Sequence, residues 1–270
     1  MKKFLTTLVA IILSIATLFT FTACGGDDNG DGLTGDLKKV TDAGKIVVGI
    51  TDYAPMDYQD ENGKWIGFDA ELAEMFAASL GVTCEFFEIA DWDAKATELQ
   101  ANSFDLIWNG MTATDKLAQQ IDLSVAYAKN AQVVIVNKDA TITADDVKNL
   151  TVAVEKGSAG NTVAADDIGV VTLNEVSSQM AALLEVVAGT SQAAIIDLTM
   201  AESVVGKNNF ADLKIAEGIS YGDEVFAVGL RKGSNLTEKL NKFLKDKYAD
   251  GTMTALLEKY QVSLNTAALA

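Results

Sequence analysis

The sequence predicts an α/β protein of two lobes, each built from a β-sheet flanked by helices. Short, continuous apolar runs alternate along the chain with segments whose apolar residues recur at helical spacing, an order typical of buried strands covered by helices. The alternation begins near residue 45 and restarts after about residue 131, which indicates a second lobe of similar construction. An apolar fraction of 49% over 270 residues is sufficient to build a core in each lobe.

The first strands and helices are expected between residues 45 and 108. The large apolar residues of Phe68–Leu80 fall on one helix face, and Gly81 is a residue that typically ends a helix. A second helical segment spans Trp92–Leu99. The strand-like runs around these two helices are Ile46–Ile50, Val82–Phe87 and Leu106–Trp108. This β-α-β-α-β order predicts parallel strands, because a helix between two strands returns the chain to the same end of the sheet.

The second half of the chain repeats the alternation. Its strand-like runs are Val133–Val136, Thr151–Val154, Val170–Leu173, Ala193–Asp197 and Val225–Leu230. Its helical segments are Thr143–Asp146, which begins with a typical N-cap residue, Met180–Val187, Leu236–Tyr248 and Thr252–Tyr260. These segments predict a second sheet and a pair of helices at the end of the chain.

The amino terminus has the order of an export signal. A basic pair at positions 2 and 3 precedes the apolar run Phe4–Phe21, and two small residues precede Cys24. A transmembrane anchor is the alternative, but the run is near the lower length limit for crossing a bilayer, and a Gly/Asp-rich stretch follows it at once. Residues 1–23 are therefore predicted to be a signal peptide.

The end of that segment, Phe21-Thr22-Ala23-Cys24, resembles the bacterial lipobox, with Phe21 in place of the usual Leu. The resemblance implies that Cys24 becomes a diacylated first residue, and two acyl chains are enough for stable membrane anchoring. Residues 24–44 are predicted to be the lipidated cysteine and a flexible tether, because the stretch after Cys24 is rich in Gly and Asp. Cys84 is then left without a partner, so no disulfide is expected.

Composition excludes several classes of function. The net charge of −17 argues against nucleic-acid binding, which needs an excess of Lys and Arg. Histidine is absent, which removes the commonest general base and the commonest zinc ligand. No catalytic residue, metal ligand or cofactor is predicted. The acidic balance suits an extracytoplasmic protein beside an anionic membrane and a cationic solute as its ligand.

Five stretches between positions 45 and 197 carry a family resemblance through their order and spacing. They are Lys45–Pro55, Asn62–Ala73, Phe104–Thr114, Glu155–Ser158 and Ala194–Asp197. Together they make the chain resemble the bacterial extracellular solute-binding proteins for polar amino acids. The resemblance implies a periplasmic-binding-protein fold of type II, in which two lobes joined by two crossover strands close over a ligand by hinge bending. Lobe one would comprise 45–130 plus 224–270, and lobe two would comprise 131–223.

The same resemblance implies a ligand site at the carboxyl ends of the strands, where ligands bind in open α/β sheets. Tyr53 would form an aromatic wall, and Trp92 and Trp108 would add aromatic surface, although Trp92 is alternatively a core residue of its helix. Asp197 would hold the ligand ammonium. The positions that match the family's contacts to the ligand's amino and carboxylate groups are Asn109, Gly110, Thr112, Ser158 and Asp197. Ser158 begins a turn whose free N–H groups suit an anion.

Leu117 departs from the family pattern. Relatives commonly carry Arg three places after the Thr that matches Thr114, and that Arg binds the ligand carboxylate with two parallel hydrogen bonds. Lys116 is one position away and is expected to point elsewhere, and Arg231 is the other basic residue considered for this role. Ala159 also replaces a frequent hydroxyl residue. The ligand is therefore expected to be a small polar solute, either an amine or cation without an α-carboxylate or an unusual amino acid held by backbone donors.

The function implied by the resemblance is the extracytoplasmic substrate-binding component of an ABC transporter for amino acids or related small amines. The protein would be a monomer, anchored to the membrane through Cys24, that delivers its solute to the transporter permease. Two alternatives remain open. One is a sensory solute-binding lipoprotein, and the other is a periplasmic dehydratase-like enzyme on the same fold, in which carboxylates alone would serve as acid and base.

Overall fold

The computed structural model describes residues 33–269. The predicted signal peptide, Cys24 with its predicted lipid, and the first part of the predicted tether lie outside these residues. Within the described range, no helix is both long enough and apolar enough to cross a bilayer.

The first sheet, which defines lobe one with its helices, has five strands in the order β4-β1-β5-β12-β6. They are β1 (Lys45–Ile50), β4 (Thr83–Glu88), β5 (Leu106–Ile107), β6 (Asp122–Leu123) and β12 (Gly229–Leu230). β1 pairs in parallel with β4 and with β5, as the β-α-β-α-β order predicts. β12 arrives from the later part of the chain and pairs antiparallel with β5 and β6, so the sheet is mixed.

Helices from both ends of the described chain belong to lobe one. They are α1 (Gly35–Ala43), α2 (Phe68–Ser79), α3 (Lys95–Gln100), α4 (Asp115–Gln120), α9 (Leu236–Ala249), α10 (Thr252–Tyr260) and α11 (Thr266–Leu269). A short hairpin of β2 (Tyr58–Gln59) and β3 (Trp65–Ile66) precedes α2. α2 buries Phe68, Leu72 and Phe76, which are on the apolar face that the sequence predicts.

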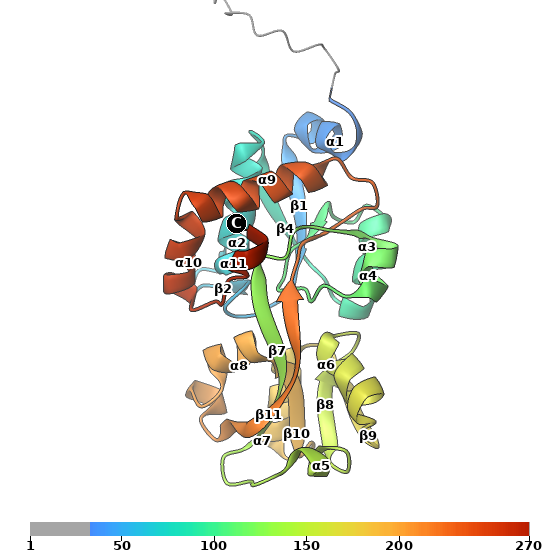
Figure 1. The fold of residues 1–270 in the computed structure, drawn as a ribbon, viewed down its shortest axis with the longest axis vertical. Helices are drawn as coiled ribbons and strands as arrows, with labels where there is room; N and C mark the ends of the chain where they lie inside the picture. The colour runs from blue at the N-terminus through green and yellow to red at the C-terminus, as the bar shows by residue number, and fades with distance from the viewer. Residues whose placement is uncertain (1–32, 270) are drawn as a thin grey trace, which may run out of the picture. The chain divides into compact units, whose positions relative to one another are not determined.

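The second sheet has the strand order β11-β7-β10-β8-β9 and defines lobe two (Figure 1). Its strands are β7 (Ala128–Asn137), β8 (Thr151–Glu155), β9 (Thr172–Val176), β10 (Ala193–Asp197) and β11 (Leu213–Phe226). Its helices are α5 (Ala144–Val147), α6 (Ala159–Thr162), α7 (Gln179–Ala188) and α8 (Leu198–Val204). β8 pairs in parallel with β9 and β10, whereas β7 is antiparallel to β10 and β11.

Two long paired strands, β7 and β11, connect the lobes, and Figure 1 shows them side by side. At their lobe-one end, Phe226 forms a bridge with Thr112, and Ala128 forms a bridge with Leu264 near the end of the chain. The lobe boundaries predicted from the sequence fall inside these two strands. The strands therefore have the positions expected of the two crossovers.

Part of the predicted tether is a helix. Residues 24–44 are predicted from the sequence to be a flexible tether, whereas Gly35–Ala43 forms α1. Val40 is buried and Leu37 packs against the core, so two apolar side chains at i and i+3 give the segment a face that it buries on lobe one. The Leu37 N–H also donates to Asn235 Oδ1 at 2.9 Å. The prediction is wrong for this part, because the Gly/Asp composition of the preceding residues does not extend into it.

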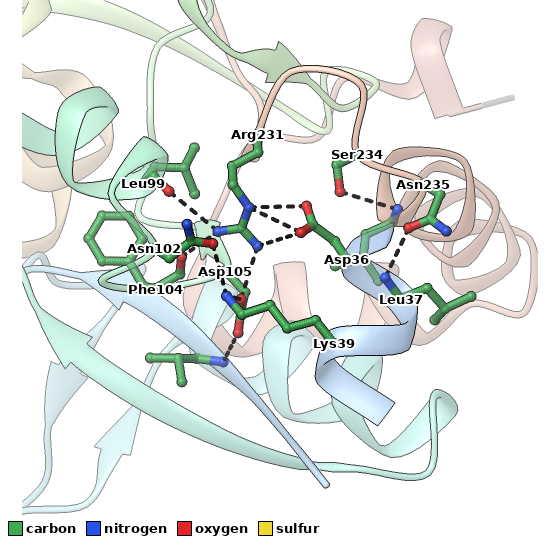
Figure 2. Close-up of polar contacts among 12 residues, drawn as sticks. Asp36, Leu37, Lys39, Leu99, Asn102, Phe104, Asp105, Arg231, Ser234 and Asn235 are labelled. Atoms are coloured by element: carbon green, nitrogen blue, oxygen red, sulfur yellow. Dashed lines mark hydrogen bonds and ion pairs between the residues drawn. The ribbon is translucent and has the colours of Figure 1, made fainter. Parts of the chain in front are cut away.

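An ion-pair network fixes α1 to the rest of lobe one (Figure 2). Arg231 Nε lies 3.1 Å from both carboxylate oxygens of Asp36, and Arg231 Nη2 lies 3.0 Å from Asp105 Oδ1. Arg231 Nη1 donates to the Phe104 carbonyl at 2.7 Å, and Lys39 Nζ lies 2.8 Å from Asp105 Oδ1. The side chains of Arg231 and Asp105 are only 13% and 6% exposed, so this charge pair is largely desolvated.

Candidate ligand-binding site

A cavity of about 200 Å³ lies between residues of lobe one and lobe two. Its lining includes Thr51, which directly follows β1, Asn109, two places after β5, and the last residues of β8 and β10, Glu155 and Asp197. The carboxyl ends of four strands therefore meet at the cavity, as the strand-end rule predicts. Pockets for drug-sized ligands measure roughly 300–1,000 Å³, so this cavity suits a smaller solute.

Most of the residues predicted from the sequence line this cavity. They are Tyr53, Trp92, Asn109, Gly110, Thr112, Leu117, Ser158 and Asp197. Four of the five segments that carry the family resemblance thus come together at one place, although they are spread over 145 positions of the chain, from Tyr53 to Asp197.

Trp108 does not line the cavity, so the prediction that it adds aromatic surface there is wrong. Its side chain is fully buried, and its ring centroid lies 6.4 Å from that of Phe76 and 6.3 Å from that of Tyr127. Successive side chains in an extended segment point to opposite sides. Since Asn109 faces the cavity, Trp108 faces the core of lobe one.

Tyr53 and Gly110 form the floor of the cavity. Gly110 has a φ of +54°, and a Cβ at this position would lie 2.4 Å from Tyr53 Cε1, so only glycine lets the loop pass under the ring. Tyr53 is 3% exposed, and its hydroxyl has no hydrogen-bond partner within the described chain. Burial and the nearby Asp197 carboxylate raise the pKa of Tyr53, so this hydroxyl remains a donor for a ligand.

The side chain of Asn109 holds the floor in place. Its Oδ1 accepts from the Thr51 N–H at 2.7 Å, and its Nδ2 donates to Thr51 Oγ1 at 2.7 Å. Because both ends of the amide are occupied, Asn109 offers a ligand mainly its backbone groups. The two bonds join the loop after β5 to the loop after β1.

Asp197 is buried, and its carboxylate accepts hydrogen bonds from three amide side chains. Its Oδ1 accepts from Asn130 Nδ2 at 2.5 Å and from Gln132 Nε2 at 2.6 Å, and its Oδ2 accepts from Gln179 Nε2. Burial raises the pKa of Asp197, and these amide donors oppose that rise. The carboxylate is thus held in a fixed position at the cavity by amide donors, with no basic side chain among residues 33–269 bonded to it.

Trp92 and Ser158 have structural roles beside their place in the lining. Trp92 is 8% exposed and packs in a cluster with Leu99. Its ring is therefore both a core residue and part of the cavity lining. Ser158 is the N-cap of α6, and its Oγ accepts from the Asn161 N–H at 3.0 Å. The Ser158 hydroxyl proton remains free for donation.

The position of the family's arginine is apolar in the structure as well. Leu117 packs against the cluster around Trp92, and its N–H donates to the N-cap side chain of Thr114 at 3.2 Å. Lys116, expected to point elsewhere, is among the residues that line the cavity, so that expectation is wrong. Arg231 cannot fill the gap, because its guanidinium is committed to the network in Figure 2.

Sequence reasoning missed a buried lysine at the cavity. Lys95 is 6% exposed, and its Nζ donates to the Trp92 carbonyl at 3.0 Å and to the Gly157 carbonyl of lobe two at 3.1 Å. Burial lowers the pKa of Lys95 to about 8, and Glu155 opposes this change. The available signal was its spacing, because Lys95 stands three places after Trp92 and four before Leu99, on the apolar helix face.

Acidic groups outnumber basic groups in the lining. The four carboxyl residues are Asp52, Asp93, Glu155 and Asp197, and the two basic residues are Lys95 and Lys116. Burial and the neighbouring Asp197 raise the pKa of Glu155 to about 8, and the nearby Lys95 charge opposes this rise. Burial also raises the pKa of Asp52. At pH 7 Glu155 is therefore largely protonated, so the negative charge of the lining rests on the other three carboxyl groups.

The carboxyl groups of the cavity do not form a recognisable metal centre. Over residues 33–269, no group of three or more His, Cys, Asp or Glu side chains is arranged to hold a metal ion. The chemistry that the arrangement offers is hydrogen bonding, ion pairing and aromatic contact.

Comparison with known proteins places this architecture among binding proteins. The arginine-binding extracellular protein ArtP of Bacillus subtilis (strain 168) is 30% identical over 267 residues, which cover 96% of this chain and 98% of ArtP. The structure of an ancestral arginine-binding protein bound to arginine is 33% identical, with a TM-score of 0.73, and covers 80% of this chain and 98% of its own. The ancestral amino acid-binding protein AncCDT-1, a precursor of cyclohexadienyl dehydratase, is 29% identical, with a TM-score of 0.77, and covers 83% and 99%.

These three relatives are described as binding proteins, and two of them are named for arginine. The profile of one family matches residues 46–263, which include both sheets and every residue of the cavity. The chain belongs to the bacterial extracellular solute-binding proteins, family 3.

Proposed function

We propose that this protein is the extracytoplasmic receptor of an ABC transporter and captures a small cationic amino acid or amine. The observation that carries the proposal is the cavity itself. Four carboxyl residues and two lysines line it, the buried Tyr53 hydroxyl has no partner in the described chain, and Leu117 occupies the place of the family's carboxylate-binding arginine. A ligand ammonium near Asp197 would match this distribution of charge, and a ligand cation near Glu155 would lower the pKa of that group and favour its ionised form.

The arginine named for ArtP and for the ancestral protein supports a ligand with a basic side chain. A second candidate is therefore an ordinary basic amino acid whose carboxylate is bound by a lysine instead of the missing arginine. The observation that favours it is the presence of Lys95 and Lys116 in the lining. An ammonium offers three donors without the planar fork of a guanidinium, so such a site would hold a carboxylate less selectively than the family's arginine.

A paired screen separates the two candidates. The mature protein is titrated by calorimetry with arginine, lysine and histidine beside their decarboxylated amines, agmatine, cadaverine and histamine. If the dominant charge of the solute must be positive, the amines bind at least as tightly as the amino acids. If the amino acids bind tightly and the amines do not, the second candidate is correct and Lys95→Met abolishes the difference.

The variant Leu117→Arg tests why the carboxylate is disfavoured. Two charge-assisted hydrogen bonds from a restored guanidinium are expected to raise amino-acid affinity roughly 30-fold or more, with little effect on the amines. Leu117→Met is the matched control, because it keeps an apolar side chain of similar volume. An arginine variant with the parent's preferences would show that position 117 does not face the ligand carboxylate.

Membrane anchoring through Cys24, a monomeric state and delivery to a permease complete the proposal. The two other hypotheses differ from it in measurable ways. A sensor would bind the solute but would leave solute uptake unchanged when its gene is deleted. An enzyme related to the dehydratase for which AncCDT-1 is a precursor would convert prephenate, whereas a receptor leaves it intact.

A further inference from the structure

Two carboxyl groups lie beneath the cavity, where solvent does not reach. Asp57 precedes the β2–β3 hairpin and Asp69 lies in the first turn of α2, and both residues are fully buried. The Tyr53 N–H donates to the Asp57 carbonyl at 2.6 Å, and the Gly110 N–H donates to Asp69 Oδ2 at 2.7 Å. The two carboxyl residues thus support the floor of the cavity without lining it.

The Asp69 side chain accepts more hydrogen bonds than the Asp57 side chain does. Asp69 Oδ2 accepts from the Gly110 N–H and from the Tyr127 hydroxyl, each at 2.7 Å. In the described chain, neither side-chain oxygen of Asp57 has a hydrogen-bond partner, and Asp69 Oδ1 has none. No basic side chain of the described residues lowers the pKa of either group.

Two buried carboxylates without a cation cannot both remain ionised, because burial and mutual repulsion oppose the second charge. Burial raises the pKa of Asp69 to about 7, and burial together with Asp69 raises the pKa of Asp57 well above its ordinary value. The Tyr127 hydroxyl, the Gly110 N–H and the nearby Trp108 indole all lower the pKa of Asp69, so the charge resides on Asp69 and the proton on Asp57. The other titratable groups that the pair affects are Tyr53, Tyr127 and Cys84, whose pKa values are all raised, so they are neutral at pH 7.

The position of Tyr127 connects this pair to the crossover strands. Tyr127 directly precedes β7, and its N–H donates to the carbonyl of Phe226, the last residue of β11, at 2.9 Å. Thr112, in the same loop as Gly110, forms a bridge with Phe226. The Asp69 carboxylate therefore joins α2, the loop at the cavity and the start of both connections between the lobes.

We propose that the Asp69 carboxylate is a positioning group of the ligand site, which holds Gly110 to Tyr127 and so fixes the cavity loop to the crossover strands. Asp57 is its protonated neighbour and allows Asp69 to carry the charge. The inference rests on the proposed function only in that the loop contacts a ligand; the arrangement of charge and proton is independent of it.

Isosteric variants of the mature, full-length protein test the inference without any ligand. Carboxyl carbon chemical shifts, followed against pH, are expected to show a neutral Asp57 and an ionised Asp69 at pH 8. Asp57→Asn imitates the protonated group, so it should leave both the pKa of Asp69 and hydrogen exchange at the Gly110 amide unchanged. Asp69→Asn should accelerate exchange at Gly110, because a neutral group is a weaker acceptor.

Tyr127→Phe is the second variant, since it removes one donor and keeps the Gly110 bond. It should raise the pKa of Asp69 and change the Gly110 exchange rate less than Asp69→Asn does. Two ionised carboxyl groups at pH 7 with ordinary pKa values, or unchanged Gly110 exchange in a folded Asp69→Asn protein, would overturn the inference.

Affinity provides a separate readout with L-arginine and agmatine as probes. Asp69→Asn is expected to weaken binding of whichever probe the parent binds by roughly 10-fold, and Asp57→Asn to leave it within about threefold. Equal affinities of a folded Asp69→Asn protein and the parent would remove the positioning role while leaving the proposed ligand class intact. If the parent binds neither probe, the proposed ligand class fails, and the carboxyl titration and Gly110 exchange still decide this inference.

Discussion

Asp197 offers the most direct test of where the ligand cation binds. The change Asp197→Asn keeps the shape of the side chain and removes its charge. Oδ1 of the new residue can still accept from Asn130 and Gln132, but its amide nitrogen then faces Gln179 Nε2, a donor opposite a donor. Gln179 cannot simply turn its amide, because its Oε1 accepts the N–H of residue 197 at 2.8 Å.

The magnitudes separate a folding effect from a binding effect. One mismatched buried hydrogen bond costs about 1–3 kcal/mol of stability, and removal of a buried charge beside Glu155 and Glu224 offsets part of that cost. The fold should therefore survive. Loss of the buried partner of a ligand cation costs about 2–4 kcal/mol of binding free energy, which corresponds to roughly a 30- to 1,000-fold weaker affinity.

Calorimetry with the tightest ligand of the amine and amino-acid screen measures this effect, and circular dichroism checks the fold. Glu224→Gln is the matched control, since Glu224 Oε2 accepts from Thr112, Asn130 and Gln132 in the same network but does not line the cavity. The control should change affinity by less than about threefold. A folded Asp197→Asn protein with the parent's affinity would refute the placement of the ligand cation at this carboxylate.

Three further perturbations have defined outcomes. Arg231→Met should lower the free energy of unfolding in urea by about 1–3 kcal/mol, because it removes the ion pair of the largely buried Asp36 while Lys39 still pairs with Asp105, whereas Lys38→Met, which removes an exposed ion pair, should cost less than ~1 kcal/mol; equal effects would contradict the desolvation argument. Burial raises the pKa of Glu155 to about 8, so the folded protein holds this proton more tightly than the unfolded chain does, and stability should fall as pH rises from 5 to 8. Urea unfolding at the two pH values should show a smaller fall for Glu155→Gln, and an equal fall would exclude this group as the cause. Cys24→Ala should release the protein from the membrane fraction of a host that processes lipoproteins, and retention at the parent's level would mean that an uncleaved helix is the anchor.

Helices and strands could be predicted from the sequence wherever either the helical or the strand pattern of apolar residues was clear. Phe68–Leu80 and Ile46–Ile50 have unambiguous helical and strand patterns, and the structure has α2 and β1 at those places. The antiparallel strand β12 was not predicted as a separate strand, because two residues carry no periodicity and its partners lie more than 100 positions away. The helix α1 was hidden by the Gly/Asp-rich stretch that precedes it.

The candidate site was predictable to the extent that it depends on strand ends. Asn109 and Asp197 directly follow or end apolar runs, and both line the cavity. The prediction for Trp108 was wrong because a shift of one residue along an extended segment turns a side chain from the core to the cavity. The sequence of a strand as short as the two residues of β5 does not show which of these two sides each side chain faces. Lys95 was missed because a lysine on an apolar helix face is ordinarily assumed to reach solvent, whereas here lobe two covers it through Gly157.

The charges at the cavity give a physical reason for closure to depend on the ligand. The contacts that join the lobes near the cavity include a half-exposed ion pair, Lys156 to Asp93 at 3.4 Å, which contributes about 0–1 kcal/mol, and the hydrogen bond from the buried Lys95 Nζ to the Gly157 carbonyl at 3.1 Å. Asp197 of lobe two and Asp52 of lobe one line the same cavity, so a cation between them contacts carboxyl groups of both lobes only in the closed arrangement. A cationic ligand would thus interact more strongly with the closed arrangement than with the open one, and this difference is what would drive closure. A neutral solute of the same size would not make the two arrangements differ in this way.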